Sequence, residues 1–289
     1  MVTGAHEPVI RGDWVRPGAH VNLVGAHTKA FGHWMWEYLP KYVEATMSGH
    51  LPCVPVLIDD GMPASHRRAL EMLLPPGVEL IVLPTGASAV VAQLWCAPSP
   101  MHMPLFEKMN ERFQWDFLAS PPKRFKRLIG EMNRRADLQI GASEQPCRKV
   151  FFARKPALHR KMVNRDEIEN IARAHGFEIV HPEDLSFDDQ VRLVRHARYI
   201  VGPEGSAMFL AFFARSGTDI CILNHPYTVG LAVLTGLLEE VGMRLVVVAG
   251  AYVKENEKLP HFADYEIAPH SFAAFLAEWV TEDGRSAER

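Results

Sequence analysis

Three short stretches of the chain combine residue types that do chemistry on phosphates and hydroxyl groups. They read FGHWMWEYLPKY at residues 31–42, RKPALHRKMVN at 154–164 and GPEGS at 202–206. An imidazole or a carboxylate can take a proton from a hydroxyl group, and arginine can hold phosphate oxygens. These stretches therefore supply the candidate site residues.

In the first stretch, His33 and Glu37 are four residues apart, so on a helix they share one face. Either could act as a general base. Trp34 and Tyr38 lie beside them and could offer flat aromatic surface to a sugar. The alternative is an amphipathic helix that buries its tryptophans and merely pairs His33 with Glu37. From the spacing alone, this alternative is favoured.

The second stretch is a basic loop that follows an apolar, strand-like segment. Its charged residues are Arg154, Lys155, His159, Arg160 and Lys161, and Asn164 ends it. Arginine forks match phosphate oxygens well. A basic loop is usually a solvated surface, but its place at the carboxyl end of a strand favours phosphate binding.

The third stretch lies between a buried strand and an apolar helix. Gly202 and Gly205 flank Glu204, and Ser206 is predicted to cap the helix, whose free N–H groups could bind a phosphate or a sugar hydroxyl. Glu204 could accept hydrogen bonds from a hydroxylated ligand. The alternative is an ordinary strand-to-helix turn with a solvated glutamate.

The elements that must position these stretches alternate between strand and helix. Strands are predicted at 20–25, 53–61, 78–84, 88–96, 149–154, 177–182, 199–202, 219–223 and 244–250. Helices are predicted at 29–47, 65–74, 104–118, 164–175, 186–197, 205–215, 228–242 and 269–280. This alternation predicts α/β domains with parallel sheets covered on both faces. In such sheets ligands bind beyond the carboxyl ends of strands, where the second and third stretches lie.

The predicted domains are residues 1–146, an N-terminal α/β domain with a linker, and residues 147–268, a C-terminal α/β domain. Residues 269–289 form a final helix and tail.

Composition excludes several functional classes. The formal net charge of −3 and the absence of long basic runs speak against a nucleic-acid partner. No apolar run is long enough for a transmembrane segment, and no signal peptide is visible. The spacings HExxH, CxxC and Asp-x-Asp are absent, so no metal is expected. We expect a cytoplasmic protein, with peripheral membrane association left open.

The four cysteines are widely separated in the sequence. They are Cys53, Cys96, Cys147 and Cys221. We expect them to be buried thiols in a reducing compartment.

With these residues in view, the sequence resembles glycosyltransferase family 61, which includes capsular-polysaccharide biosynthesis proteins. Residues 31–42 resemble its aromatic-His-aromatic block with an acid and a proline, and RKPALHRKMVNRDEI resembles its Arg and Asn block. The long segment from HGFEIVHP to GTDICIL resembles its C-terminal block. The three blocks occur in family order over residues 31–223. Two departures are Glu204, where many members have histidine, and the lack of an asparagine near Leu210.

The resemblance implies two Rossmann-like domains that face each other across a cleft, the GT-B architecture. It implies that residues 1–146 form the acceptor-side domain and that residues 147–268 form the nucleotide-sugar-binding domain. It implies an inverting, metal-independent transfer of a sugar from a nucleotide-sugar to a hydroxyl acceptor, in polysaccharide or glycan biosynthesis. The nucleotide-sugar is a co-substrate, and no cofactor is implied. Alternatives are a polysaccharide pyruvyl-transferase-like enzyme and a non-catalytic nucleotide-sugar or glycan-binding relative. The sequence makes no prediction about the oligomeric state.

The resemblance also suggests roles for single residues. Arg154 and Arg160 would hold the donor diphosphate, with help from the backbone around Gly202, Gly205 and Ser206. Asn164 would orient the loop or touch the donor. Glu37 or His33 would deprotonate the acceptor, and Glu204 would bind donor-sugar hydroxyls, with base catalysis by Glu204 the less favoured role.

Overall fold

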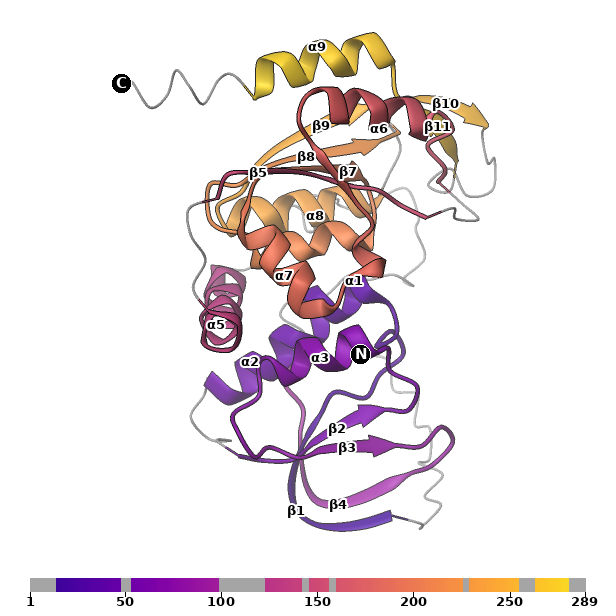
Figure 1. The fold of residues 1–289 in the computed structure, drawn as a ribbon. Coiled ribbons are helices and arrows are strands. Elements are labelled where there is room, and N and C mark those ends of the chain that lie inside the picture. The colour runs from indigo at the N-terminus through magenta and orange to yellow at the C-terminus, as the bar shows by residue number, and fades with distance from the viewer. Residues whose placement is uncertain are drawn as a thin grey trace. The chain divides into compact units, whose positions relative to one another are not determined.

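The computed structural model describes residues 14–47, 53–98, 123–141, 146–155, 160–225, 229–254 and 263–280. The chain divides into two compact units, Met1–His102 and Met103–Arg289 (Figure 1). The predicted helix at 104–118 and the predicted site residue His159 lie outside the described residues. The predicted domain boundary near residue 146 stays a prediction.

The first unit is built on a parallel four-stranded sheet. Its strands are β1 (Trp14–Asn22), β2 (Val56–Asp59), β3 (Leu80–Leu83) and β4 (Ala89–Trp95), in the order β3-β2-β1-β4. β1 begins earlier than the strand predicted at 20–25, because its first residues pair with β4 across a register shift between Arg16 and Ala19. The strand order is that of a Rossmann half.

One long helical region of the first unit carries the first candidate stretch. It consists of α1 (Phe31–His33), a π-helical turn η1 (Trp34–Tyr38) and α2 (Leu39–Met47). Pro40 explains the π turn, since proline has no N–H and its ring clashes with the carbonyl four residues earlier. The turn widens there, and the Leu39 N–H bonds to the carbonyl of Trp34. Figure 1 shows α2 and α3 (Ala64–Glu71) across one face of the sheet.

The second unit contains a parallel five-stranded sheet. Its strands are β5 (Arg148–Phe152), β6 (Glu178–Val180), β7 (Ala197–Pro203), β8 (Asp219–Asn224) and β9 (Arg244–Ala249). Each coincides with a predicted strand, and their order is β6-β5-β7-β8-β9. In chain order this is 2-1-3-4-5, the flavodoxin-like arrangement, in which ligands bind where the strand order reverses. That point lies between β5 and β7.

Helices cover both faces of this sheet, as a doubly wound fold requires (Figure 1). On one face lie α6 (Arg165–Ala174) and α9 (Pro269–Trp279). The other face carries α5 (Lys123–Ile140), α7 (Phe187–Arg195), η3 (Ser206–Phe213) and α8 (Val229–Glu240). A short helical turn, η2 (Pro182–Asp184), and an antiparallel pair, β10 (Ala251–Lys254) and β11 (Asp264–Glu266), complete the unit. The sequence pattern does not predict the pair β10–β11.

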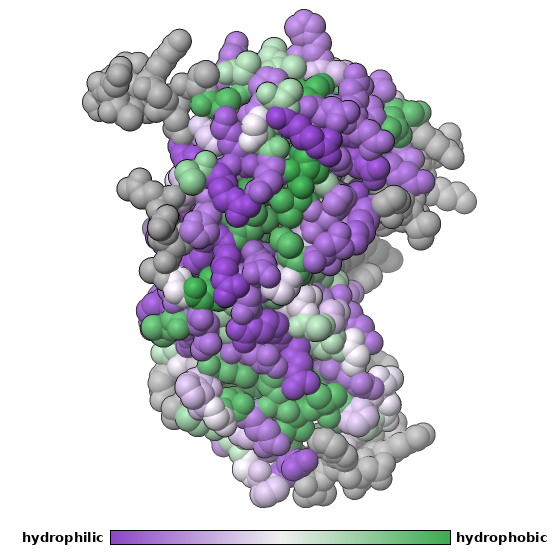
Figure 2. Space-filling view, viewed as in Figure 1, coloured by the Kyte–Doolittle hydropathy of each residue, from purple (hydrophilic) through white to green (hydrophobic). Residues whose placement is uncertain are grey.

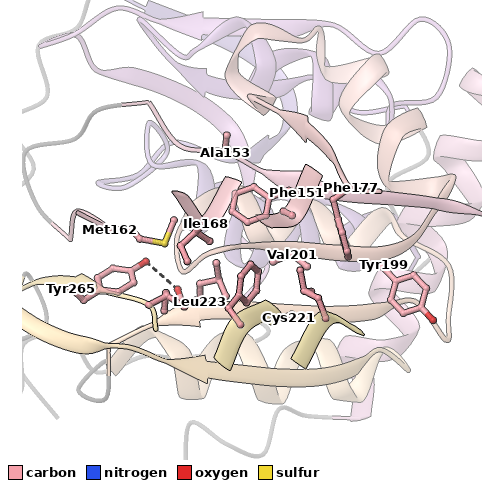
Figure 3. Close-up of a cluster of buried hydrophobic side chains, with 14 residues drawn as sticks. Phe151, Ala153, Met162, Ile168, Phe177, Tyr199, Val201, Cys221, Leu223 and Tyr265 are labelled. Carbon is pink, nitrogen blue, oxygen red and sulfur yellow. Dashed lines mark hydrogen bonds between the residues drawn. The ribbon is translucent and has the colours of Figure 1, made fainter. Parts of the chain in front are cut away.

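The core beneath α6 and α9 is apolar and continuous (Figure 3). Phe151 of β5, Val201 of β7 and Leu223 of β8 belong to one buried cluster with Ile168 of α6 and Phe272 of α9. Full burial of such side chains is worth about 1.5–3 kcal/mol each. This packing fixes the carboxyl ends of the three strands relative to one another, within the second unit.

The prediction of buried cysteines is wrong for three of the four. Cys221 lies in the β8 core and burial raises the pKa of its thiol. Cys53, Cys96 and Cys147 are exposed, because they lie just outside strands rather than within them.

No helix among the described residues is both long and apolar enough to cross a membrane. Hydrophilic and hydrophobic residues are mixed over the face drawn in Figure 2.

Candidate functional site

The strand-order reversal in the second unit brings two of the three candidate stretches together. Arg154 follows β5, and Glu204 follows β7, the strand beside it. Arg160 Nη1 donates to Oε2 of Glu204. The structure thus joins Arg154, Arg160 and Glu204, which the sequence left on two separate loops.

Glu204 is a buried residue. Only 8% of it is exposed, and its backbone N–H donates to the carbonyl of Leu223 at 2.9 Å. The alternative of a solvated turn glutamate is therefore wrong. A carboxylate is rarely buried without a charged partner, and Arg160 provides that partner.

Arg160 has an unusual backbone. Its φ of 55° is the one left-handed value among the described residues other than glycine. Such a conformation costs of order 1–3 kcal/mol and persists where the surroundings enforce it, often at functional sites. Here it turns the Arg160 guanidinium toward Glu204.

Arg154 carries unused hydrogen-bonding capacity. Its buried Nη1 has no hydrogen-bond partner among the residues that the structure describes, and the same holds for Nε of Arg160. Burial lowers the pKa of Arg154, and the positive charge of Arg160 lowers it further. Arg154 and Arg160 carry two positive charges against the one negative charge of Glu204, the carboxylate to which Arg160 bonds. An anion is the ligand that would satisfy both the charge and the free donors.

A cavity of about 510 Å³ opens at this place. Its lining includes Arg154, Arg160, Lys161, Asn164 and Pro203. The volume lies in the range typical of small-molecule sites. On the other side it meets the first turn of α6, where Asp166 and Glu167 also line it. The cavity therefore offers cations on the loop and carboxylate acceptors on the helix.

The glycine turn has a different local structure from the one predicted. The helix η3 is a 3₁₀ helix that begins at Ser206, and its N-cap is Gly205, so the prediction of Ser206 as the cap is wrong. A Cβ at Gly202 would lie 3.0 Å from the Cβ and the carbonyl oxygen of Phe152. Gly202 therefore allows close packing of β7 on β5. Ser206 is exposed.

Both polar atoms of the Asn164 side-chain amide form hydrogen bonds with the backbone of one residue, Ile267. Its Nδ2 donates to the carbonyl of Ile267 at 2.7 Å, and its Oδ1 accepts from the Ile267 N–H at 3.2 Å. Although Asn164 is the N-cap of α6, it makes no side-chain cap bond. Of the two predicted roles, orientation of the loop fits this geometry.

In the first unit, His33 and Glu37 share one helix face as predicted. His33 Nδ1 and Glu37 Oε2 are 3.2 Å apart, and Lys41 Nζ donates to the other carboxylate oxygen at 3.0 Å. Burial would raise the pKa of Glu37, but hydrogen bonds from His33 and Lys41 outweigh it, so the pKa is lowered. The ring of His27 stacks on His33, with centroids 4.6 Å apart.

The aromatic residues of the first stretch belong to the core. Trp34, Trp36 and Tyr38 are all buried. Trp34 Nε1 donates to the carbonyl of His66 at 2.9 Å. The expectation that Trp34 and Tyr38 offer flat surface to a sugar is therefore wrong, and the stacked His27 and His33 lie beside Glu37 instead.

Two residues that sequence reasoning did not assign support the sites. Asp59 ends β2, and its Oδ2 accepts from the Gly25 N–H at 3.0 Å and from Thr28 Oγ1 at 2.6 Å, which ties down the loop after β1. Tyr265 of β11 lies close to Arg154, Arg160 and Glu204, all of which influence its pKa, and burial raises that pKa. Asp59 lies near the carboxyl end of the strand predicted at 53–61, a signal that could have found it, whereas no sequence signal points to Tyr265.

Comparison with known proteins bears on the family of the chain. No curated protein matches it. The model of the family described as Glycosyltransferase 61 matches residues 31–221, a range that contains both His33 and Glu37 and the Arg154–Arg160–Glu204 cluster. In the part of the chain that the structure describes, no three His, Cys, Asp or Glu side chains form a group that could hold a metal ion. Because the family model matches more than half of the chain, the chain belongs to glycosyltransferase family 61 and is a glycosyltransferase, which moves a sugar from a donor to an acceptor.

Proposed function

We propose that the protein is an inverting, metal-independent glycosyltransferase of GT-B architecture. It would move a sugar from a nucleotide-sugar to a hydroxyl acceptor in polysaccharide or glycan biosynthesis, without a cofactor. The observation that carries the proposal is the partly unsatisfied pair of guanidinium groups, Arg154 and Arg160, at the strand-order reversal of the second sheet. A diphosphate supplies the missing negative charge and the missing acceptors.

On the donor side, Arg154 and Arg160 hold the diphosphate oxygens. As the bond between the anomeric carbon and the diphosphate breaks, negative charge grows on the leaving oxygen. Fixed cations in a half-buried site stabilise that charge more in the transition state than in the ground state. The backbone N–H groups at the start of η3 add to this field, since a helix N-terminus favours anions. Glu204 keeps acceptor capacity for a hydroxyl group of the donor sugar.

On the acceptor side, we assign the base to His33. Glu37 has a lowered pKa and both its oxygens accept hydrogen bonds, so it is a weak base. It can instead hold the Nδ1–H of His33 and stabilise the imidazolium, which leaves Nε2 to take the proton. The acceptor oxygen bonds to the anomeric carbon, its proton passes to Nε2, and the electron pair of the broken bond leaves with the diphosphate. A single displacement of this kind inverts the anomeric centre.

The first test is donor binding by calorimetry with a panel of uridine and guanosine diphosphate sugars. Loss of a charge-assisted hydrogen bond costs about 1.5–3 kcal/mol, so Arg154→Gln and Arg160→Gln should each weaken binding at least tenfold. Arg192→Gln is the matched control, because Arg192 pairs with Asp189 on the surface of the same unit. Unchanged affinity in both site variants would refute the diphosphate site.

The second test concerns the metal. Turnover of the best-binding donor should be unchanged after exhaustive treatment with a chelator, since the guanidinium groups already balance the leaving charge. Activity that disappears with chelator and returns with magnesium or manganese would remove metal independence from the proposal.

A further inference from the structure

The loop that carries Arg160 is paired to the C-terminal strand β11. The Tyr265 N–H donates to the carbonyl of Lys161 at 2.9 Å, and the Val163 N–H donates to the carbonyl of Tyr265 at 2.8 Å. These bonds form a parallel bridge between Met162 and Tyr265. The Lys161 N–H also donates to Oδ1 of Asp264 at 2.9 Å. We call this contact, between residues 161–164 and 264–267, the β11 pairing.

Asn164 closes one end of the β11 pairing. Its two bonds to the backbone of Ile267 continue the ladder with a side-chain amide. An amide that donates and accepts at once reproduces the pattern of a backbone group. Alanine at this position would leave the backbone groups of Ile267 without these partners.

The side chain of Tyr265 extends the pairing to the glycine turn. Tyr265 is 2% exposed, and its hydroxyl donates to the carbonyl of Leu223 at 3.2 Å (Figure 3). The same carbonyl accepts the backbone N–H of Glu204 at 2.9 Å. One tyrosine therefore connects the Arg160 loop, through its backbone, to the turn of Glu204, through its hydroxyl.

This arrangement explains how Arg160 keeps its left-handed backbone. A strained backbone conformation persists where the surrounding structure holds the residue in place. The residue directly after Arg160 is Lys161, which is bonded to β11 through both its N–H and its carbonyl. We propose that the β11 pairing, through Tyr265 and Asn164, is the positioning device that holds Arg160 against Glu204 in the donor site. β11 lies beyond residues 31–221, the range of the family match.

The inference rests on the proposed function for the identity of the ligand, but it can be tested in the absence of a ligand. Hydrogen exchange of the peptide that covers residues 160–165 should speed up at least tenfold in Asn164→Ala, because the pairing that protects it opens more often. Asn133→Ala is the matched control: Asn133 Nδ2 likewise donates to a backbone carbonyl, that of Phe212, at 2.7 Å in the same unit. The control should leave exchange of that peptide unchanged.

The second readout is calorimetric binding of inorganic diphosphate. Asn164→Ala should weaken it about tenfold, and Tyr265→Phe, which keeps the backbone pairing and loses one hydroxyl bond, by about three- to tenfold. Asn133→Ala should bind diphosphate like wild type, even where it lowers the melting temperature as much as Asn164→Ala does.

The outcomes separate the two proposals. Wild-type protein that fails to bind diphosphate, or an Arg154→Gln variant that binds it equally well, would overturn the proposed function. Exchange at 160–165 that stays unchanged in Asn164→Ala would overturn the β11 pairing as a positioning device, whatever the ligand does. The β11 pairing is likewise overturned if Asn164→Ala weakens diphosphate binding no more than Asn133→Ala.

Discussion

Glu204 lies between two glycines at the carboxyl end of a strand. This position was enough to predict it as a site residue, since ligands bind at such ends. Its burial and its bond to Arg160 could not be predicted, because they depend on the left-handed backbone of Arg160 forty-four residues earlier. The predicted topology indicated Glu204 as a site residue. Its bond to Arg160 depends on a strained backbone conformation that no short sequence motif predicts.

The bond between His33 and Glu37 leads to a prediction at the same scale. Glu37→Gln removes the negative charge that stabilises the His33 imidazolium. Turnover should fall by about 10²–10⁴, while donor affinity stays close to that of wild type. Steady-state kinetics and calorimetry measure the two effects separately.

The control for this experiment is Glu71→Gln. Glu71 pairs with Arg67 at 3.0 Å on the exposed face of α3 in the same unit. That variant should turn over normally. Full activity in Glu37→Gln would instead move the base away from the His33–Glu37 pair.

At the scale of elements, the alternating pattern predicted every strand of the two parallel sheets. Departures occur where local chemistry overrides the pattern. Pro40 opens a π turn in the first long helix, and the Pro-Gly step inside β1 shifts its register against β4. The pair β10–β11 was missed because β10 follows β9 after a single residue, and because β11 reads DYE and so has only one apolar residue.

Gly25 yields an element-level prediction, since it lies where the loop after β1 meets η1. A Cβ there would come within 2.2 Å of the Tyr38 hydroxyl oxygen. Gly25→Ala should therefore force Tyr38 aside and destabilise the protein by about 1–3 kcal/mol. Urea unfolding measures the change.

Gly130→Ala is the opposite case and serves as the control. Gly130 lies inside α5, and nothing would meet its Cβ within 4 Å. Alanine there should stabilise by up to about 1 kcal/mol, because glycine is a poor helix residue. Equal destabilisation by both substitutions would show that the contact with Tyr38 is not the cause.

At the scale of the whole molecule, the sequence predicted two α/β halves but not their strand orders. The orders β3-β2-β1-β4 and β6-β5-β7-β8-β9 depend on which strands pair, and apolar runs buried on both faces carry little information about their neighbours. The strand order nevertheless decides the site, since it places β5 beside β7. This neighbourhood of β5 and β7 brings the basic loop of Arg154 and Arg160 next to the turn of Glu204.

The stability of the whole chain should depend on pH through His66, which is 2% exposed and lies against Phe31 and Trp34. Burial lowers its pKa from 6.5 to about 4. The folded state therefore takes up a proton on His66 less readily than the unfolded state does. As a result, the free energy of unfolding is highest above about pH 6.5 and decreases as the pH falls toward 4. Between pH 7.5 and pH 5 the loss should be about 2 kcal/mol.

Urea unfolding followed by tryptophan fluorescence tests this directly, because Trp14, Trp34, Trp36 and Trp95, four of the six tryptophans, lie in the first unit. His66→Phe cannot titrate, so its stability should change between pH 7.5 and pH 5 by about 2 kcal/mol less than that of wild type. His270→Gln alters an exposed histidine on α9 and should keep the wild-type dependence. An equal pH dependence in His66→Phe and wild type would mean that the buried imidazole takes up its proton without cost to the fold.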